Sequence, residues 1–245
     1  MLRGIYISAG SMVNQQRKLD VVSNNLANVN TTGFKKDLMV EEADRNKSIL
    51  KVAKDVTPIG DLYFGVRPGE VYTDFVSSSG FTNTDNPMDV AIKGNGFFQV
   101  NTPRGIRYTR DGSFTRSNDG YLVTAEGYRV QGQNGDVRLG NGKITFGNRG
   151  EIYINGQARG MLRIVDFPDT VALRKEGDNL LISQGGGNLI ANPEIEAGVL
   201  ESSNVNPVTE LVDMISLMRD YEANQKVVTT MDSTLDKSVN ELGRV

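Results

Sequence analysis

The stretch Ser23–Lys35, which reads SNNLANVNTTGFK, decides the architecture of the chain because a long helical pattern stops within it. It holds four asparagines, and asparagine is a poor helix former since its amide competes for nearby backbone groups. Gly33 suits the left-handed position that often follows the last helical residue, and Phe34 comes directly after it. We therefore predict that an N-terminal helix ends near Gly33.

The residues before this stretch follow the repeat of a helix with one buried face. Their spacing alternates between four and three positions, as in a heptad seam. The seam consists of Ile5, Ala9, Met12, Gln16, Leu19, Ser23 and Leu26, with Val13, Val22 and Val29 beside it. This pattern predicts a long amphipathic helix at the start of the chain.

A second long helix is predicted at the other end of the chain. Asn206 is a candidate N-cap, and Pro207 suits the first helical position. The second seam consists of Leu211, Met214, Met218, Tyr221, Gln225, Val228, Asp232, Leu235, Val239 and Leu242, with Ile215 and Val227 beside it. Because an isolated helix is marginal in water, each helix needs a partner surface. Pairing or packing within one chain and association with other copies both remain open.

Between the helices, the sequence is typical of short antiparallel strands joined by tight turns. Short apolar or alternating runs are separated by small turn pairs. These pairs are Asp111-Gly112, Asp119-Gly120, Glu126-Gly127, Asn134-Gly135, Asn141-Gly142 and Asn155-Gly156. The chain is therefore predicted to be α+β, with an all-β middle.

We expect the helices to form one domain from residues 1–34 and 205–245, and the strands to form an outer domain from residues 76–190. Residues 35–75 and 191–204 are predicted to connect them. Within 35–75, the charged run KKDLMVEEADRNKSILKVAKDV fits a helix or an extended segment, whereas PIGDLYFGVRPGEVY favours an extended one.

The composition excludes several kinds of chemistry. The 245 residues include no His, no Cys and no Trp. Histidine general bases, cysteine nucleophiles, disulfides and His- or Cys-based metal sites are therefore absent. A net charge of -3 gives no electrostatic reason to expect nucleic acid as a partner. No apolar run is long enough to span a membrane, and the N-terminus lacks the pattern of a standard secretory signal.

Three pairs of carboxylates are candidates for general acid–base chemistry. They are Asp85 with Asp89, Glu41 with Glu42, and Asp111 with Asp119. Asp111 and Asp119 each precede a glycine, and Asp85 lies in NTDNP, so turn formation explains them better than catalysis. We predict neither a catalytic site nor a cofactor or metal.

Four stretches together resemble the bacterial flagellar axial proteins, the family of rod, hook and hook-associated proteins. The first is SNNLANVNTTGFK. The others are NPMDVAIKGNGFFQV (residues 86–100), YTRDGSFTRSNDGYLVTAEGYRVQG (108–132) and GVLESSNVNPVTELVDMISLMRDYEANQKVV (198–228). They occur in the order that the family has and cover both ends and the middle of the chain.

This resemblance implies a non-enzymatic building block of the basal-body rod. The terminal helices would pair into a coiled-coil-like core that packs with the same protein and other rod subunits around an export channel. The protein would leave the cytoplasm through the flagellar export apparatus without a cleaved signal peptide, and would reside in the periplasmic or cell-wall zone of the basal body. It would not insert into a membrane.

The length favours one member of the family. Hook proteins are usually much longer, and distal-rod proteins typically carry an insertion rich in Gln and Pro after the first helix, which this chain lacks. We therefore expect the proximal-rod member that adjoins the distal rod. The alternatives are a distal-rod or hook-type subunit, a β-domain on a helical stalk that binds or hydrolyses cell-wall carbohydrate, and a general coiled-coil adaptor.

The predicted assembly interface follows the two helical seams and the asparagines of the first stretch. We expect Asn24, Asn25 and Asn28 to form hydrogen bonds either across subunit contacts or to the connecting segment. The full set is Ile5, Met12, Leu19, Asn24, Asn25, Leu26, Asn28, Leu211, Met214, Met218, Tyr221, Val228 and Leu235.

Overall fold

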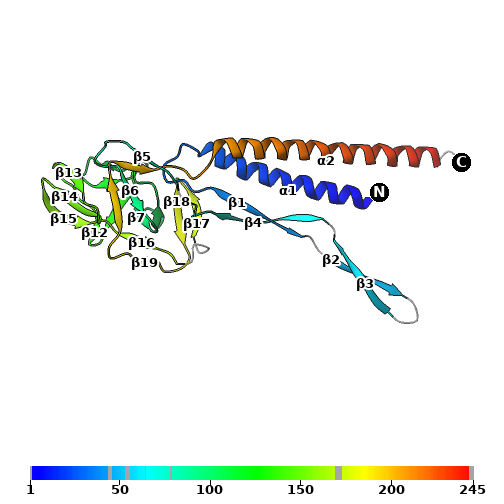
Figure 1. Ribbon diagram of the computed structural model, residues 1–245, viewed down its shortest axis with the longest axis horizontal. Coiled ribbons are helices and arrows are strands. Elements are labelled where there is room, and N and C mark those ends of the chain that lie inside the picture. Colours follow the sequence, from blue (N-terminus) through cyan, green and yellow to red (C-terminus); the bar gives the residue numbers. More distant parts are fainter. Residues whose placement is uncertain are drawn as a thin grey trace. The chain divides into compact units, whose positions relative to one another are not determined.

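A computed structural model of the chain describes residues 2–43, 46–52, 56–63, 65–77, 79–168 and 173–242. A helix at each end and a β-rich region between them confirm the predicted α+β class (Figure 1). The chain divides into two compact units, each formed from separate stretches of sequence. The helical unit comprises Met1–Ala27, Asp37–Tyr72 and Asn206–Val245, and the β unit comprises Asn28–Lys36 and Thr73–Val205.

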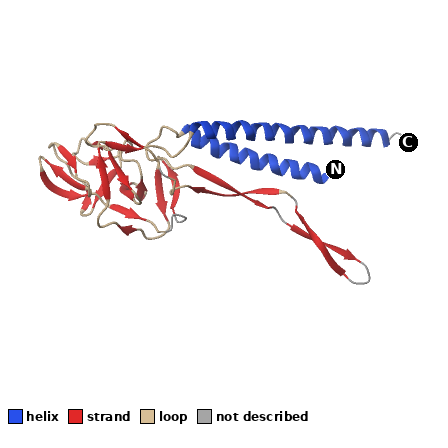
Figure 2. Ribbon diagram, viewed as in Figure 1, coloured by secondary structure: helices blue, strands red, loops and turns tan. Residues whose placement is uncertain are grey.

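The helical unit contains two long helices that lie side by side (Figure 2). Helix α1 spans Leu2–Ala27 and helix α2 spans Pro207–Leu242. The side-chain oxygen of Asn206 accepts hydrogen bonds from the backbone N–H groups of Val208, at 3.0 Å, and Thr209, at 3.3 Å. Asn206 is therefore the N-cap of α2, as predicted.

The first helix ends earlier than predicted. Helix α1 stops at Ala27, and a turn follows in which the N–H of Thr31 donates to the carbonyl oxygen of Asn28 at 3.1 Å. Gly33 does have a left-handed backbone, with a φ angle of 64°. The prediction that Gly33 ends the helix is wrong, because this residue comes after the turn and serves a contact within the β unit.

The segment whose conformation the sequence left open is extended where the structure describes it. Strands β1 (Asp37–Ala43) and β4 (Val66–Thr73) pair with each other. Strands β2 (Asn46–Val52) and β3 (Val56–Tyr63) form an antiparallel ribbon with Asn46 opposite Tyr63 and Val52 opposite Val56.

Among the described residues, the largest sheet of the β unit has ten strands, in which β17, β18, β8, β7, β11, β10 and β9 are neighbours in that order. Strand β12 pairs with β11, and β16 pairs with both β7 and β19. The strands are β7 (Phe97–Thr102), β8 (Gly105–Thr109), β9 (Thr115–Arg116), β10 (Leu122–Val123), β11 (Arg129–Gly132), β12 (Gly135–Asp136), β16 (Ile164–Asp166), β17 (Leu173–Gly177), β18 (Leu180–Ser183) and β19 (Asn188–Leu189).

Smaller sheets complete the β unit. Strands β13, β14 and β15 form one sheet, β20 pairs with β6, and β21 pairs with β5. Their bounds are β5 (Phe81–Asn83), β6 (Val90–Lys93), β13 (Ile144–Phe146), β14 (Glu151–Ile154), β15 (Gln157–Met161), β20 (Glu194–Ala197) and β21 (Val199–Glu201). Asn155 and Gly156 join β14 to β15 with φ angles of 51° and 78°. Two positive φ angles define the hairpin turn that the Asn-Gly pair predicted.

The hydrophobic core of the β unit consists of two clusters of buried apolar side chains. Phe98 and Phe114 are almost completely buried and stack edge to face with ring centroids 5.0 Å apart. A second cluster surrounds Phe97, whose ring is 5.5 Å from that of Phe75. These two clusters give the β unit its own core.

Candidate assembly interface

Polar side chains and a glycine take part in the contacts between the two helices. The amide nitrogen of Asn224 donates to Oε1 of Gln15 at 3.2 Å. A Cβ atom at Gly4 would lie 2.7 Å from Cε of Met231, so the helices approach closely there. These contacts show that α1 and α2 run antiparallel. On α2 the half-buried line includes Leu217, Asn224 and Met231. It also includes the predicted Met214, Tyr221 and Val228, each of which lies three residues before one of them.

Asn25 anchors the last turn of α1 within the helical unit. Its side chain is 1% exposed. Its Oδ1 accepts a hydrogen bond of 2.8 Å from the N–H of Asp37, and its Nδ2 donates to the carbonyl oxygen of Asp37 at 2.9 Å. Nδ2 also lies 3.4 Å from a carboxylate oxygen of Glu210, which is itself buried. Asn25 thus joins the end of α1 to the start of β1 and to the first turn of α2.

Replacing Asn25 with alanine should lower the free energy of unfolding by about 1–3 kcal/mol, because it leaves the buried carboxylate of Glu210 and the half-buried backbone groups of Asp37 without this partner. Ser23→Ala is the control, since Ser23 is exposed on the same helix, and it should change stability by less than about 0.5 kcal/mol. Urea denaturation of the purified chain measures both. Equal effects of the two substitutions would contradict the anchoring role of Asn25.

A carboxylate on β1 bonds to the middle of α1. Oε1 of Glu41 lies 2.5 Å from Nζ of Lys18 and accepts a hydrogen bond of 2.6 Å from Nδ2 of Asn14. The hydrogen bond from Lys18 holds the pKa of Glu41 below its ordinary value, with a smaller contribution from Asn14. Glu41 is partly exposed, so solvent screens this attraction and its contribution to stability is small.

The outer side of α2 is apolar over its first three turns. Val208, Leu211, Val212, Ile215 and Met218 are between 45% and 67% exposed. Their spacing places them on one side of the helix, opposite the half-buried line that faces α1. We call these five residues the α2 apolar face.

The predicted interface residues occupy three kinds of position. Asn25 is buried, whereas Asn24, Leu211 and Met218 are exposed. The half-buried residues are Ile5, Met12, Leu19, Leu26, Asn28, Met214, Tyr221, Val228 and Leu235. The role of the set in assembly stays a prediction, since it concerns contacts between chains. Val208 and Val212 were not among the predicted residues, although their spacing with Leu211 and Ile215 is that of a helical face.

Two of the carboxylates considered for catalysis, Asp89 and Asp111, stabilise turns. Oδ1 of Asp111 accepts hydrogen bonds from the backbone N–H of Ser113 at 2.9 Å and from its hydroxyl at 2.7 Å. Asp89 is buried and accepts a hydrogen bond of 2.9 Å from Nδ2 of Asn86. In the described part of the chain, no cluster of carboxylates could hold a metal ion, and no helix is long and apolar enough to cross a membrane.

Comparison with protein families gives three matches along the chain. Residues 5–35 match the model of the flagella basal body rod protein. Residues 91–161 match the D1 domain of the flagellar hook proteins FlgE, FlgF and FlgG, and residues 196–242 match the C-terminal domain of the rod proteins FlgE, FlgF and FlgG.

Curated relatives match nearly the whole chain. The flagellar basal-body rod protein FlgG of Bacillus subtilis is 34% identical over 262 aligned positions, covering 98% of this chain and 99% of the relative. FlgG of Buchnera aphidicola subsp. Schizaphis graminum is 39% identical, covering 97% and 98%. The rod protein FlgF of Caulobacter vibrioides is 34% identical over 253 positions and covers both chains completely.

The chain has a helix at each end, an exposed apolar face on α2 and a β unit between the helices in sequence. Together with the three matched domains, these features define an axial protein of the bacterial flagellum. The chain belongs to the flagellar basal-body rod protein family. This confirms the family predicted from four sequence stretches, and with it the role of a structural subunit of the rod.

Proposed function

We propose that this chain is the proximal-rod subunit next to the distal rod, and that its helical unit packs with copies of itself and with other rod proteins. The observation that carries the proposal is the α2 apolar face, five large apolar side chains exposed on one helix. A contiguous apolar patch on a soluble chain marks an interaction site. Because each of these side chains is already partly buried, covering the rest of it would contribute about 1–2 kcal/mol.

In the assembled rod, the two helices would form a coiled-coil-like core. The predicted interface residues that are half-buried in one chain, such as Met12 and Tyr221, would complete their burial against neighbouring helices. Polar contacts between α1 and α2, such as that of Gln15 with Asn224, would fix the pairing of the helices without using the outer apolar side chains.

The proximal position is supported by the length of 245 residues and by the absence of the Gln- and Pro-rich insertion of distal-rod members. A structural role without catalysis is supported by the turns that Asp89 and Asp111 stabilise. The family resemblance supports export through the flagellar export apparatus and a location in the periplasmic or cell-wall zone.

Electron microscopy of basal bodies from a strain that lacks this chain tests the proposal. We expect a truncated rod without the distal rod or hook, and a complementing copy should restore full length. Rods of normal length in the deletion strain would contradict the proposed function. Release of peptidoglycan fragments by the purified protein, lost in an Asp89→Ala variant, would favour the cell-wall hydrolase instead.

A further inference from the structure

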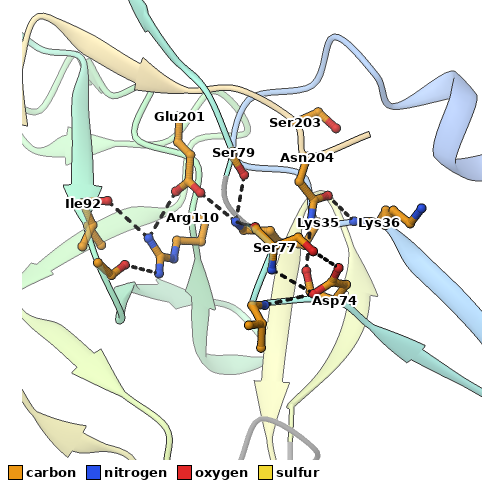
Figure 3. A network of polar contacts seen from close by, with 12 residues as sticks. Lys35, Lys36, Asp74, Ser77, Ser79, Ile92, Arg110, Glu201, Ser203 and Asn204 are labelled. Carbon is orange, nitrogen blue, oxygen red and sulfur yellow. Dashed lines mark hydrogen bonds and ion pairs between the residues drawn. The ribbon is translucent and has the colours of Figure 1, made fainter. Parts of the chain in front are cut away.

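The chain passes between the helical unit and the β unit four times. One polar network joins the segments of the β unit that lie next to these passages (Figure 3). The passages lie at residues 27–28, 36–37, 72–73 and 205–206. Three short segments of the β unit lie next to them, namely Asn28–Lys36, residues 73–79 and residues 199–205. We call the network that joins these segments the clasp.

The centre of the clasp is a buried carboxylate shared by two cations. Oε1 of Glu201 lies 2.8 Å from Nζ of Lys35, and Oε2 lies 3.2 Å from Nη1 of Arg110. All three side chains are at most 8% exposed. Lys35 also donates to Oγ of Ser79 at 2.8 Å, and Arg110 donates to the carbonyl oxygen of Gly94 at 2.6 Å. Burial lowers the pKa of Arg110, and the charge of Glu201 opposes this effect.

Neutral hydrogen bonds join the same segments around this centre. The N–H of Gly33 donates to the carbonyl oxygen of Glu201 at 2.7 Å. The N–H of Lys36 donates to Oδ1 of Asn204 at 2.7 Å, and Nδ2 of Asn204 donates to the carbonyl oxygen of Asp74 at 3.1 Å. The N–H of Asp74 in turn donates to the carbonyl oxygen of Lys36 at 2.9 Å. Each segment therefore bonds directly to the other two.

Such a network is not explained by stability alone. A buried ion pair is often no more stabilising than well-packed apolar side chains of similar volume, whereas removing one partner is strongly destabilising. Charge-assisted hydrogen bonds are directional and short, so they hold segments in one relative position. The β unit also has two apolar clusters that provide its core, and Phe75 of the 73–79 segment packs against the second of them.

We propose that the clasp is a mechanical joint: it makes all the chain segments that leave the β unit resist a pull together, so that force from the helices is not borne by one segment. The use of this joint in a drive shaft rests on the proposed rod function, but the joint itself belongs to the isolated chain. Breaking the contact between Lys35 and Glu201 should therefore weaken the β unit most when force enters through the passages.

Single-molecule pulling at constant force tests this directly. Because the chain has no cysteine of its own, handles can be attached at two introduced cysteines. Handles attached to Ala27→Cys and Val208→Cys, both exposed, deliver force to the β unit through two of its passages, at residues 27–28 and 205–206. We expect Lys35→Met to accelerate unfolding of the β unit about tenfold or more. The matched control is Lys93→Met, which removes an exposed ion pair of 2.9 Å with Glu196 outside the clasp and should change the rate less than about twofold.

A second direction of pulling separates a mechanical joint from ordinary stabilisation. Handles at Glu126→Cys and Thr145→Cys, exposed positions of the β unit, stretch a part of the chain that contains no clasp residue. In this direction Lys35→Met should have less than about a third of its effect through the passages. Equal acceleration in both directions, or an equal effect of Lys93→Met, would overturn the proposal.

Two further measurements keep the outcome clear. If Lys35→Met fails to fold, Asn204→Ala replaces it, since this change removes only neutral hydrogen bonds between the segments. The rod function is tested independently by the deletion strain. Normal rods in that strain contradict the rod function whatever the pulling gives, and pulling without direction dependence contradicts only the clasp.

Discussion

Replacing Gly33 with alanine is expected to lower the free energy of unfolding of the β unit by about 3–5 kcal/mol, a large part of the stability of a typical domain. Gly33 has a φ angle of 64°, where a non-glycine residue costs about 1–2 kcal/mol. An added Cβ would also lie 2.5 Å from the carbonyl carbon and 2.6 Å from the carbonyl oxygen of Arg110. These are backbone atoms, so no side-chain rotation relieves the overlap.

Gly127→Ala is the matched control for this prediction, and urea denaturation followed by circular dichroism measures both variants. Gly127 also has a positive φ angle, of 88°, but a Cβ there would meet no atom within 4 Å. Its substitution should therefore cost only the backbone strain, about 1–2 kcal/mol. The difference between the two variants measures the close approach at Gly33. A loss at Gly33 no larger than that at Gly127 would show that the overlap is readily relieved.

Gly33 also shows how far local sequence logic reaches. The motif correctly predicts a left-handed glycine, because glycine is the residue that adopts a positive φ angle without cost. It does not reveal what that conformation serves. The helix ends at Ala27, and Gly33 instead approaches the backbone of Arg110, a contact between residues far apart in sequence. A helix end and a close tertiary contact look alike in a short motif.

The strands of the β unit were predictable because their signal is local. A pair such as Asn155-Gly156 fixes a hairpin turn through the backbone preferences of two residues. The clasp was not predictable, because Lys35, Arg110 and Glu201 are widely separated and each is an ordinary charged residue in its own stretch. A charged side chain is usually exposed, so only the fold reveals that these three are buried together.

The helical contacts were predicted in part, for a physical reason. Periodicity assigns the most apolar line of a helix to its nearest partner. Met214, Tyr221 and Val228 are half-buried, as this rule expects, but Met218 is exposed. On α1, Gln15 and Gly4 contact α2 although neither belongs to the predicted apolar line. The rule fails for an apolar line that is exposed in the single chain. A subunit that packs against neighbouring helices needs such a line.

Met218→Asp is therefore expected to abolish rod assembly and swimming while leaving the single chain folded. Met218 is 50% exposed, so the free energy of unfolding should change by less than about 0.5 kcal/mol. Once a neighbouring helix covers the α2 apolar face, the same aspartate would be a buried charge without a partner, which is strongly unfavourable. Complementation of the deletion strain, with swimming in soft agar and electron microscopy of basal bodies, measures assembly, and urea denaturation measures folding.

Two neighbouring substitutions make the result specific to this face. Gln225→Asp places the same charge seven residues later on the same side of α2, where an exposed polar residue already stands, and it should leave swimming close to normal. Leu217→Asp lies on the half-buried line toward α1 and should destabilise the chain itself. Loss of swimming with a stable chain at Met218, and not at Gln225, locates the subunit contact on the α2 apolar face. Normal rods in the Met218→Asp strain would show instead that this face stays exposed in the rod, and the contacts between subunits would then have to come from the half-buried residues of α1.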